Sequence, residues 1–359
     1  MKLSHGGPRP PRLGFLGLGW IGLDRMEAIA RSGVAEVAAV CDMNQEAVTK
    51  ALALAPGARR FESLTGMLDA ELDGLVIATP SGLHAQQAIA ALNRGVAVFC
   101  QKPLARTASE TRQVTDAARR AKRLLAVDLS YRFTSAMTAV RRSVQRGEVG
   151  EIFAADLVFH NAYGPSKGWC YDPALAGGGC LIDLGIHLVD LALWTLSFPS
   201  VTAATGRLYS RGVPLLPDPS TIEDYAEAQL SLETGAVVRM ACSWRMSLGC
   251  DAVIGATFHG TNGGVAMRNV NGSFHDFVAE RYQGTTRETL CAPPDDWGAR
   301  AAIAWARRLA NGERFDPAVE RLSAVAGALD GIYGRAGWRD PWVDRAPFRM
   351  TSSEMRAMR

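Results

Sequence analysis

The sequence predicts an α/β protein, with a doubly wound parallel sheet in the N-terminal domain and an α+β domain on a largely antiparallel sheet after it. Three observations support this. Short apolar strands alternate with helical segments up to residue 128, and later strands follow one another through glycine-containing turns. The length of 359 residues also exceeds the size at which one core usually stops growing. We therefore expect domains at 1–129 and 130–345, with a C-terminal tail at 346–359.

The first domain is built from apolar runs that suit strands buried on both faces of a parallel sheet. We expect five such strands, at Leu13–Leu16, Glu36–Cys41, Gly74–Ala78, Ala97–Cys100 and Leu124–Asp128. Helical segments lie between them, at Ile21–Arg31, Gln45–Ala55, Leu83–Arg94 and Ser109–Lys122. Thr107 and Glu110 have the spacing of a capping box, which fixes the start of the last helix.

The second domain begins with a helix near residues 133–146. Strand-like runs follow, at Ile152–His160, Val201–Leu208, Tyr225–Leu232, Ala236–Trp244, Ala252–Phe258 and Gly264–Arg268. Short turns such as Thr234–Gly235 separate several of them, which favours antiparallel pairing. Two more helices are expected near Trp297–Asn311 and Pro317–Gly334.

Composition limits the classes of partner. The 39 basic and 36 acidic residues are scattered without a basic run, so nucleic-acid binding is not expected. Seven cysteines lie far apart without a C-x-x-C pair, which favours a reducing cytoplasm and predicts neither a disulfide framework nor a metal site. We find no uninterrupted apolar segment of membrane-spanning length and no signal peptide, so a cytoplasmic protein without a membrane partner is expected.

A glycine-rich turn follows the first strand and opens the first helix. In Gly17-Leu-Gly19-Trp20-Ile21-Gly22, the first glycine permits a tight turn, the second lets a pyrophosphate approach, and the third allows close packing of helix and sheet. Asp42 ends the second strand, where a carboxylate accepts hydrogen bonds from an adenosine ribose. A carboxylate would repel a 2′-phosphate, so NAD is favoured over NADP. NADP stays possible, because Arg59 or Arg60 could fold back toward the site.

Two further segments reach the same edge of the sheet. Thr79, Pro80 and His84 follow the Gly74–Ala78 strand, and Gln101 and Lys102 follow the next one. Ligands of parallel sheets bind at this edge, so we expect all five residues at the cofactor. The alternatives are an ordinary turn for the first segment and a solvated surface lysine for the second.

The apolar stretch 177–190 carries Asp183, His187 and Asp190 at helical spacing, so they would share one face of a helix. Removing a hydride from a secondary alcohol requires a base for the hydroxyl proton and a cation beside the developing alkoxide. We assign His187 as the base, Lys102 as the cation and Asp183 as an orienting group. Asp190 is equally well explained as a structural hydrogen-bond partner.

The motifs GLGWIG, ATPSGLH, QKPLA and GGGCLIDLGIHLVD, in that order, resemble the Gfo/Idh/MocA family of oxidoreductases. The resemblance implies an N-terminal Rossmann domain, a C-terminal domain whose open sheet serves oligomerisation, and a nicotinamide cofactor at their junction. It matches Lys102 to the lysine of an E-K-P motif and Asp183 and His187 to a D-x-x-x-H pair. It also matches Tyr131-Arg132 to a Y-R pair whose arginine borders the substrate. Gln101 departs from the family, which usually has glutamate there.

We therefore predict an NAD-dependent oxidoreductase, with NADP possible, that acts on a secondary alcohol or ketone of a sugar, inositol or related polyol. Besides Lys102, Arg132, Asp183 and His187, the expected substrate contacts are His160, Asn161, Tyr163 and Trp169. A homodimer or homotetramer is expected from the resemblance. Two alternatives stay open: a glycoside hydrolase that uses transient oxidation by bound NAD, and a non-catalytic sugar sensor or coregulator that holds the cofactor.

Overall fold

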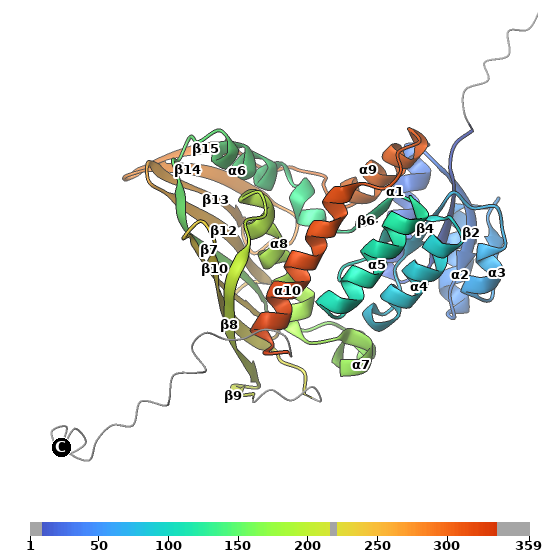
Figure 1. Ribbon diagram of the computed structural model, residues 1–359, viewed down its shortest axis with the longest axis horizontal. Coiled ribbons are helices and arrows are strands. Elements are labelled where there is room, and N and C mark those ends of the chain that lie inside the picture. Colours follow the sequence, from blue (N-terminus) through green and yellow to red (C-terminus); the bar gives the residue numbers. More distant parts are fainter. Residues whose placement is uncertain (1–8, 216–220, 336–359) are drawn as a thin grey trace, which may run out of the picture.

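The computed structural model describes residues 9–215 and 221–335, so the predicted tail 346–359 lies outside the described residues. Two sheets lie side by side, each with its own helices (Figure 1). The predicted fold class is confirmed: the first sheet is entirely parallel and the second is mostly antiparallel.

The first sheet has six strands in the order β3-β2-β1-β4-β5-β6. Their bounds are β1 Arg12–Leu16, β2 Glu36–Cys41, β3 Arg59–Arg60, β4 Gly74–Ile77, β5 Ala97–Cys100 and β6 Leu125–Val127. The strand order reverses between β1 and β4, which opens a ligand crevice at the carboxyl ends of these strands. The sequence did not predict β3, because its two arginines are exposed and carry no apolar pattern.

Helices cover both faces of this sheet and bury two separate apolar clusters. α1 Trp20–Ser32 and α2 Gln45–Leu54 pack on one face. α3 Leu64–Leu68, α4 Ser81–Asn93 and α5 Ala108–Ala121 pack on the other. The predicted cap of α5 is confirmed, because the Thr107 hydroxyl accepts a hydrogen bond from the Glu110 backbone N–H at 3.1 Å.

The second sheet has nine strands in the order β15-β14-β13-β12-β7-β11-β10-β8-β9. Only β7 and β11 pair in parallel among neighbours of this sheet. The bounds are β7 Ile152–Asn161, β8 Val201–Ser210, β9 Val213–Pro214, β10 Tyr225–Leu232, β11 Val237–Ser243, β12 Ala252–Gly260, β13 Gly263–Asn269, β14 Phe277–Gln283 and β15 Thr286–Cys291. The sequence did not predict β9, β14 or β15.

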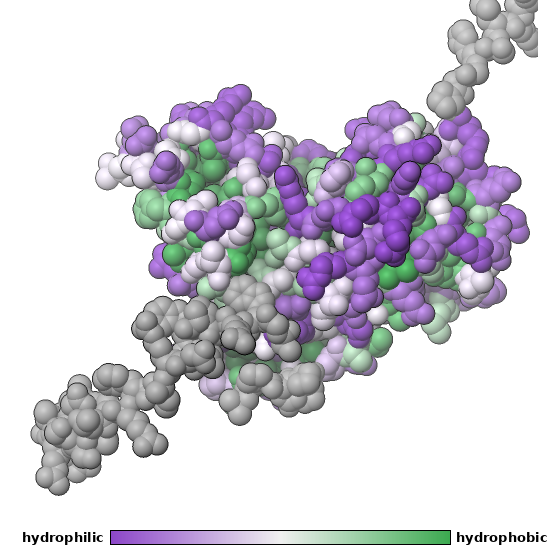
Figure 2. All heavy atoms as spheres, viewed as in Figure 1, coloured by the Kyte–Doolittle hydropathy of each residue, from purple (hydrophilic) through white to green (hydrophobic). Residues whose placement is uncertain are grey.

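One face of the nine-stranded sheet packs against α6 Ser135–Gln145, α8 Ile186–Thr195 and α10 Leu322–Ile332. Among residues 9–215 and 221–335, no helix covers the other face (Figure 1). It exposes Phe153 and Val253, but also the ion pair between Asp156 and Arg239 at 2.7 Å. In Figure 2, hydrophilic side chains cover much of the first domain, and hydrophobic ones appear between polar neighbours over the second sheet.

The helix α9, Arg300–Ala310, returns to the first domain. Trp305 is buried in the cluster between α1, α2 and the parallel sheet, with its ring centroid 5.6 Å from that of Phe99. Figure 1 shows α9 beside α1 and away from the second sheet. From the sequence, this helix was expected in the 130–345 domain. Its side chains instead pack into the core of the first domain. The domain boundaries themselves stay a prediction.

One helical stretch, Pro173–Thr195, would be long and apolar enough to cross a membrane by length and composition alone. Of its most apolar window, 78% is buried inside the protein. Asp183, His187 and Asp190 also interrupt it, so its apolar character is that of a core helix.

Candidate active site

The turn from β1 into α1 requires its glycines. Gly17 has φ +87°, and a Cβ there would lie 2.6 Å from the Ala78 carbonyl carbon. A Cβ on Gly22 would lie 2.1 Å from the Gly17 carbonyl oxygen. Gly19 begins α1 without a side-chain cap, and the first turn holds no acidic residue. Unbonded backbone N–H groups at this helix end form an anion site, which fits a pyrophosphate.

Asp42 fixes this turn to the end of β2. Its carboxylate accepts hydrogen bonds from the Leu18 N–H at 2.5 Å and the Asn44 N–H at 2.7 Å. Beside it, the Met43 side chain is fully exposed, and Trp20 on the other side of the turn is 72% exposed. Uncovered apolar groups that flank an anion site and a carboxylate fit a dinucleotide, with Met43 suited to the adenine. Met43 was not among the residues predicted from sequence, although its place directly after Asp42 was a usable signal.

The basic residues considered for a 2′-phosphate are engaged elsewhere. The Arg60 guanidinium pairs with Glu62 at 2.9 Å, and the Arg59 guanidinium lies 5.1 Å from the ring centroid of Phe61. Neither arginine forms an ion pair with Asp42 among the described residues.

One of the predicted cofactor residues, His84, joins two loops. His84 is fully buried, with its ring nitrogens 2.7 Å from the Pro103 carbonyl oxygen and 2.8 Å from that of Thr79. Burial lowers the pKa of this imidazole, although both carbonyls favour a protonated ring. Pro80 begins α4. These contacts align the segments that carry Thr79 and Lys102, and a direct contact of His84 or Pro80 with a cofactor stays a prediction.

Gln101 also points into the protein. Its amide donates to the Asp128 carboxylate at 2.5 Å, and the buried Arg25 donates to the same oxygen at 2.7 Å. The amide thus contributes a donor where a glutamate would set a second carboxylate against Asp128.

The negative charge beside Lys102 is the Asp183 carboxylate. The Lys102 ammonium donates to the Asp183 carboxylate at 2.5 Å and to the Asp183 carbonyl at 2.7 Å. The Trp244 indole N–H donates to the other carboxylate oxygen at 3.1 Å. An ammonium has three donors, so one remains for a substrate oxygen. Lys102 of the first domain and Asp183 of the second therefore meet in the structure, while their catalytic roles stay predictions.

His187 lies one turn beyond Asp183 and is only 6% exposed. It packs against Tyr131 at 4.8 Å between ring centroids. Burial, and to a smaller extent the nearby Lys102 ammonium, hold the pKa of His187 well below its usual range. Within residues 9–215 and 221–335, no group hydrogen-bonds to its ring. A neutral imidazole with an unused nitrogen is suited to accept a proton.

The helix that carries these groups departs from the expected geometry. Leu181–Gly185 forms one wide π-turn before α8 begins. Its entrance is held by Glu223, whose buried carboxylate accepts from the N–H groups of Gly179 at 2.8 Å and Leu181 at 2.9 Å and from the Tyr333 hydroxyl at 2.8 Å. The sequence analysis missed Glu223, which lies outside every motif.

Asp190 has a structural partner. Its carboxylate takes a bidentate contact from the Arg132 guanidinium, which also lies over Trp194 and Phe198. Asp190 is therefore a structural hydrogen-bond partner of Arg132, the alternative given for it from the sequence. Two nitrogens of the Arg132 guanidinium donate to Asp190. A contact between Arg132 and the substrate stays a prediction.

The predicted substrate residues separate into two groups. Trp169 lines a pocket with Lys102, Asp183 and Trp244, whose further lining residues are Ser81, Pro103, Cys170, Ala176, Gly178 and Ile182. The others, including His187 and Arg132, are not among its lining residues. His160 bonds to the Ser243 hydroxyl at 2.8 Å, Tyr163 is 51% exposed beside Phe274, and the Asn161 side-chain oxygen is buried without a partner among the described atoms. Their contact with substrate stays a prediction.

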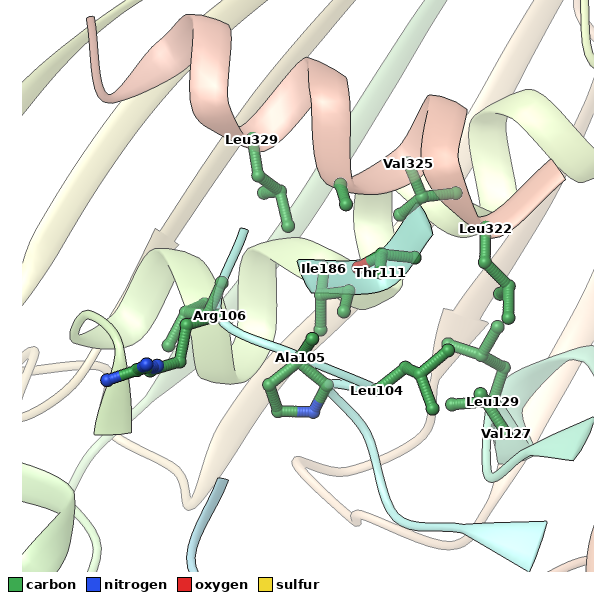
Figure 3. A pocket seen from close by; sticks show the side chains of 13 residues that line it. Leu104, Ala105, Arg106, Thr111, Val127, Leu129, Ile186, Leu322, Val325 and Leu329 are labelled. Atoms are coloured by element: carbon green, nitrogen blue, oxygen red, sulfur yellow. The ribbon is translucent and has the colours of Figure 1, made fainter. Parts of the chain in front are cut away.

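The segment after Lys102 is anchored by apolar packing. In Figure 3, Leu322, Val325 and Leu329 of α10 point toward the segment that carries Leu104 and toward Ile186 of α8, around a small apolar cavity. This contact ties the lysine segment to the helix of His187.

Within the described ranges, no group of three His, Cys, Asp or Glu side chains could hold a metal ion.

Comparison with known families gives two matches. A model described as an oxidoreductase family with an NAD-binding Rossmann fold matches residues 12–129. A model of the GFO/IDH/MocA C-terminal domain matches residues 137–266.

Curated relatives and solved structures agree with these matches. The chain is 28% identical over 275 residues to D-glucoside 3-dehydrogenase of Escherichia coli, covering 72% of this chain and 77% of that protein. It is 29% identical over 318 residues to inositol 2-dehydrogenase 2 of Saccharopolyspora erythraea, covering 81% and 90%. Levoglucosan dehydrogenase in complex with NADH has a similar fold, with a TM-score of 0.76, 21% identity, and coverage of 91% of this chain and 97% of that one.

Proposed function

The chain belongs to the Gfo/Idh/MocA family of NAD(P)-dependent oxidoreductases, and on that basis we propose that it oxidises a secondary alcohol of a sugar, inositol or related polyol, or reduces the matching ketone. The observation that carries this is the contact at 2.5 Å between Lys102 of the first domain and Asp183 of the second. It joins a cation to the helix of His187 beside a dinucleotide site.

The nicotinamide ring, when bound, accepts or returns the hydride. Lys102 holds the reacting oxygen with its remaining donor and favours the developing alkoxide. Asp183 keeps the ammonium in place, since Trp244 orients its carboxylate. His187 takes the hydroxyl proton at its unused ring nitrogen, and burial keeps it neutral at neutral pH.

The substrate class is supported by the pocket and by the relatives. Trp169 and Trp244 offer flat apolar faces beside polar groups, a combination that suits polyols with apolar ring faces. Two relatives are named for compounds of this kind, a glucoside dehydrogenase and an inositol dehydrogenase. NAD is favoured over NADP because Asp42 presents a carboxylate, and Arg59 and Arg60 contact Phe61 and Glu62. We further propose a cytoplasmic homodimer or homotetramer formed through the helix-free face of the nine-stranded sheet.

The test is hydride transfer in two variants. Lys102→Ala and His187→Ala should each slow NADH formation from the preferred polyol at least about a hundredfold, because electrostatic and acid/base help is lost. Binding of NAD should be retained in both. Near-normal turnover in both variants would refute the proposal. Glycoside cleavage without net NADH would indicate the hydrolase alternative, and tight sugar binding without any redox change would indicate the sensor.

A further inference from the structure

A lysine of the second domain lies over the glycine-rich turn of the first. Lys167 precedes the short helical turn Gly168–Tyr171, in the segment between β7 and α7 Pro173–Ala176. Its Nζ lies 2.6 Å from the position that a Cβ on Gly19 would take. The ammonium therefore occupies the space that the missing side chain leaves beside the first turn of α1.

The Lys167 ammonium has no carboxylate partner among the described residues. Among described lysines, ion pairs are formed by Lys50 with Glu46 and by Lys102 with Asp183, and none by Lys167. The N-terminal end of α1 carries partial positive charge, with no acidic residue in its first turn and no side-chain cap. An ammonium beside this end is repelled by it, and the arrangement becomes favourable when an anion lies between the two.

The anion that reaches this turn is the dinucleotide pyrophosphate. We propose that Lys167 binds the pyrophosphate from the second domain, opposite the backbone N–H groups of α1, so that the cofactor is held between the two domains. This inference rests on the dinucleotide site of the proposed function. It adds a residue that no glycine-rich motif contains, because Lys167 lies far from that motif in sequence and reaches it only through the fold.

The segment that carries Lys167 is tied to both domains. The Arg245 guanidinium donates to the Tyr171 hydroxyl at 3.0 Å within the second domain. The Arg106 guanidinium of the first domain donates to the Ala174 carbonyl at 3.0 Å. Trp169, two residues after Lys167, lines the pocket of Lys102. Binding of the pyrophosphate therefore fixes one wall of the substrate pocket as well.

The test separates the pyrophosphate from the rest of the cofactor. Calorimetry gives dissociation constants for ADP-ribose, which has the pyrophosphate but no nicotinamide, and for adenosine, which has no phosphate. Lys167→Ala should weaken ADP-ribose binding about tenfold or more, since a hydrogen bond to a charged group is lost. Lys167→Glu should weaken it further, and Lys167→Arg should stay within about threefold of the unmodified protein. Adenosine binding should not change.

The matched control is Lys50→Ala, which removes the same charge from an exposed position on α2 and should leave both constants unchanged. Unchanged ADP-ribose binding in Lys167→Ala, an equal loss for adenosine, or a change confined to the KM of the polyol would each overturn the assignment of Lys167. Failure of the unmodified protein to bind ADP-ribose would instead remove the dinucleotide site itself, and the proposed function with it.

Discussion

His187 shows how one side chain acquires its chemistry from its surroundings. It is buried beside Tyr131 and near the Lys102 ammonium, and both conditions disfavour its charged form. The same imidazole on the surface would be partly protonated near neutral pH. Its proposed role as a base therefore depends on burial as much as on its position one turn after Asp183.

This environment gives a pH dependence with a definite sign. The pKa of His187 in the folded protein lies well below 6.5, so loss of kcat/KM for alcohol oxidation on the acidic side should occur below pH 6.5. Initial rates across pH 4.5–8.5, a range of about four units around the histidine value, measure this. An acidic limb centred above pH 6.5 would contradict the assignment of His187 as a buried neutral base.

Stability should follow the same group. The unfolded chain protonates this histidine near its ordinary pKa and the folded chain does not, so its contribution is complete above about pH 6.5 and is lost as pH falls toward the lowered value. Urea unfolding at two pH values, compared between the unmodified protein and His187→Asn, isolates this contribution. Acidification should destabilise the variant less than the unmodified protein, because the variant lacks the His187 imidazole. His84 is present in both proteins and contributes equally to both.

The site residues show what sequence can predict at this scale. Lys102 and Asp183 lie in recognisable motifs, but their ion pair was not predicted and appears only in the structure. Lys167 and Glu223 carried no local signal, because each acts on a segment that is remote in sequence. The sequence marked Trp244 only as the end of a strand. The hydrogen bond from its indole to Asp183 forms because the fold brings β11 next to the π-turn.

At the scale of elements, the π-turn and its cap decide how the active-site helix begins. The wide turn over Leu181–Gly185 is followed by α8, and Glu223 accepts three hydrogen bonds at its entrance. A Cβ on Gly179 would lie 1.9 Å from the Glu223 backbone carbonyl oxygen, so the close approach of the Glu223 backbone requires a glycine here. Orientation of Asp183 and His187 thus depends on a residue that has no chemistry of its own.

Glu223→Ala should therefore be destabilising and should also lower kcat. The substitution leaves two buried backbone donors and the partly buried Tyr333 hydroxyl without their partner, which costs about 2–4 kcal/mol in unfolding free energy. Urea unfolding and initial rates measure the two effects. The exposed Glu227→Ala on β10 is the control and should change stability by less than about 0.5 kcal/mol. Equal stability of both variants would rule out the capping role.

The elements that sequence failed to predict share a physical cause. In β15, four consecutive residues are exposed, so no apolar alternation marks it. β14 contains Glu280 and Arg281 within an otherwise apolar run, and the buried Glu280 is accommodated by Arg268 at 3.1 Å on the neighbouring strand. Pairing across strands satisfies such residues, and that pairing is not visible in a single segment. Strands with regular apolar patterns were predicted correctly, within a few residues at their ends.

At the scale of the whole molecule, the chain crosses between the two domains more than once. α9 follows β15 of the second sheet, yet its Trp305 fills the core of the first. Gly74 at the start of β4 makes room for this ring, because a Cβ there would lie 2.7 Å from it. An amphipathic helix pattern predicts a buried face without identifying its partner, so sequence could not assign α9 to either core.

Trp305→Ala should lower the unfolding free energy by about 3–5 kcal/mol, through loss of buried surface and the cavity left behind. Trp305→Phe should cost much less. It keeps a ring against Phe99 and removes an indole N–H that has no partner among the described atoms. Denaturant unfolding measures both, and ADP-ribose affinity reports on the first domain. Equal losses for the two variants would show that ring packing is not what this position contributes.

The return of α9 also bears on how the protein is made. As the ribosome releases the chain from its N-terminus, the six parallel strands emerge long before residues 300–310 do. At about 5–20 residues per second, roughly 170 residues of the second domain must be synthesised in between, which takes on the order of ten seconds or more. During that interval one face of the nascent sheet lacks its tryptophan and stays partly open to water, so completion of the first domain waits for translation of the second.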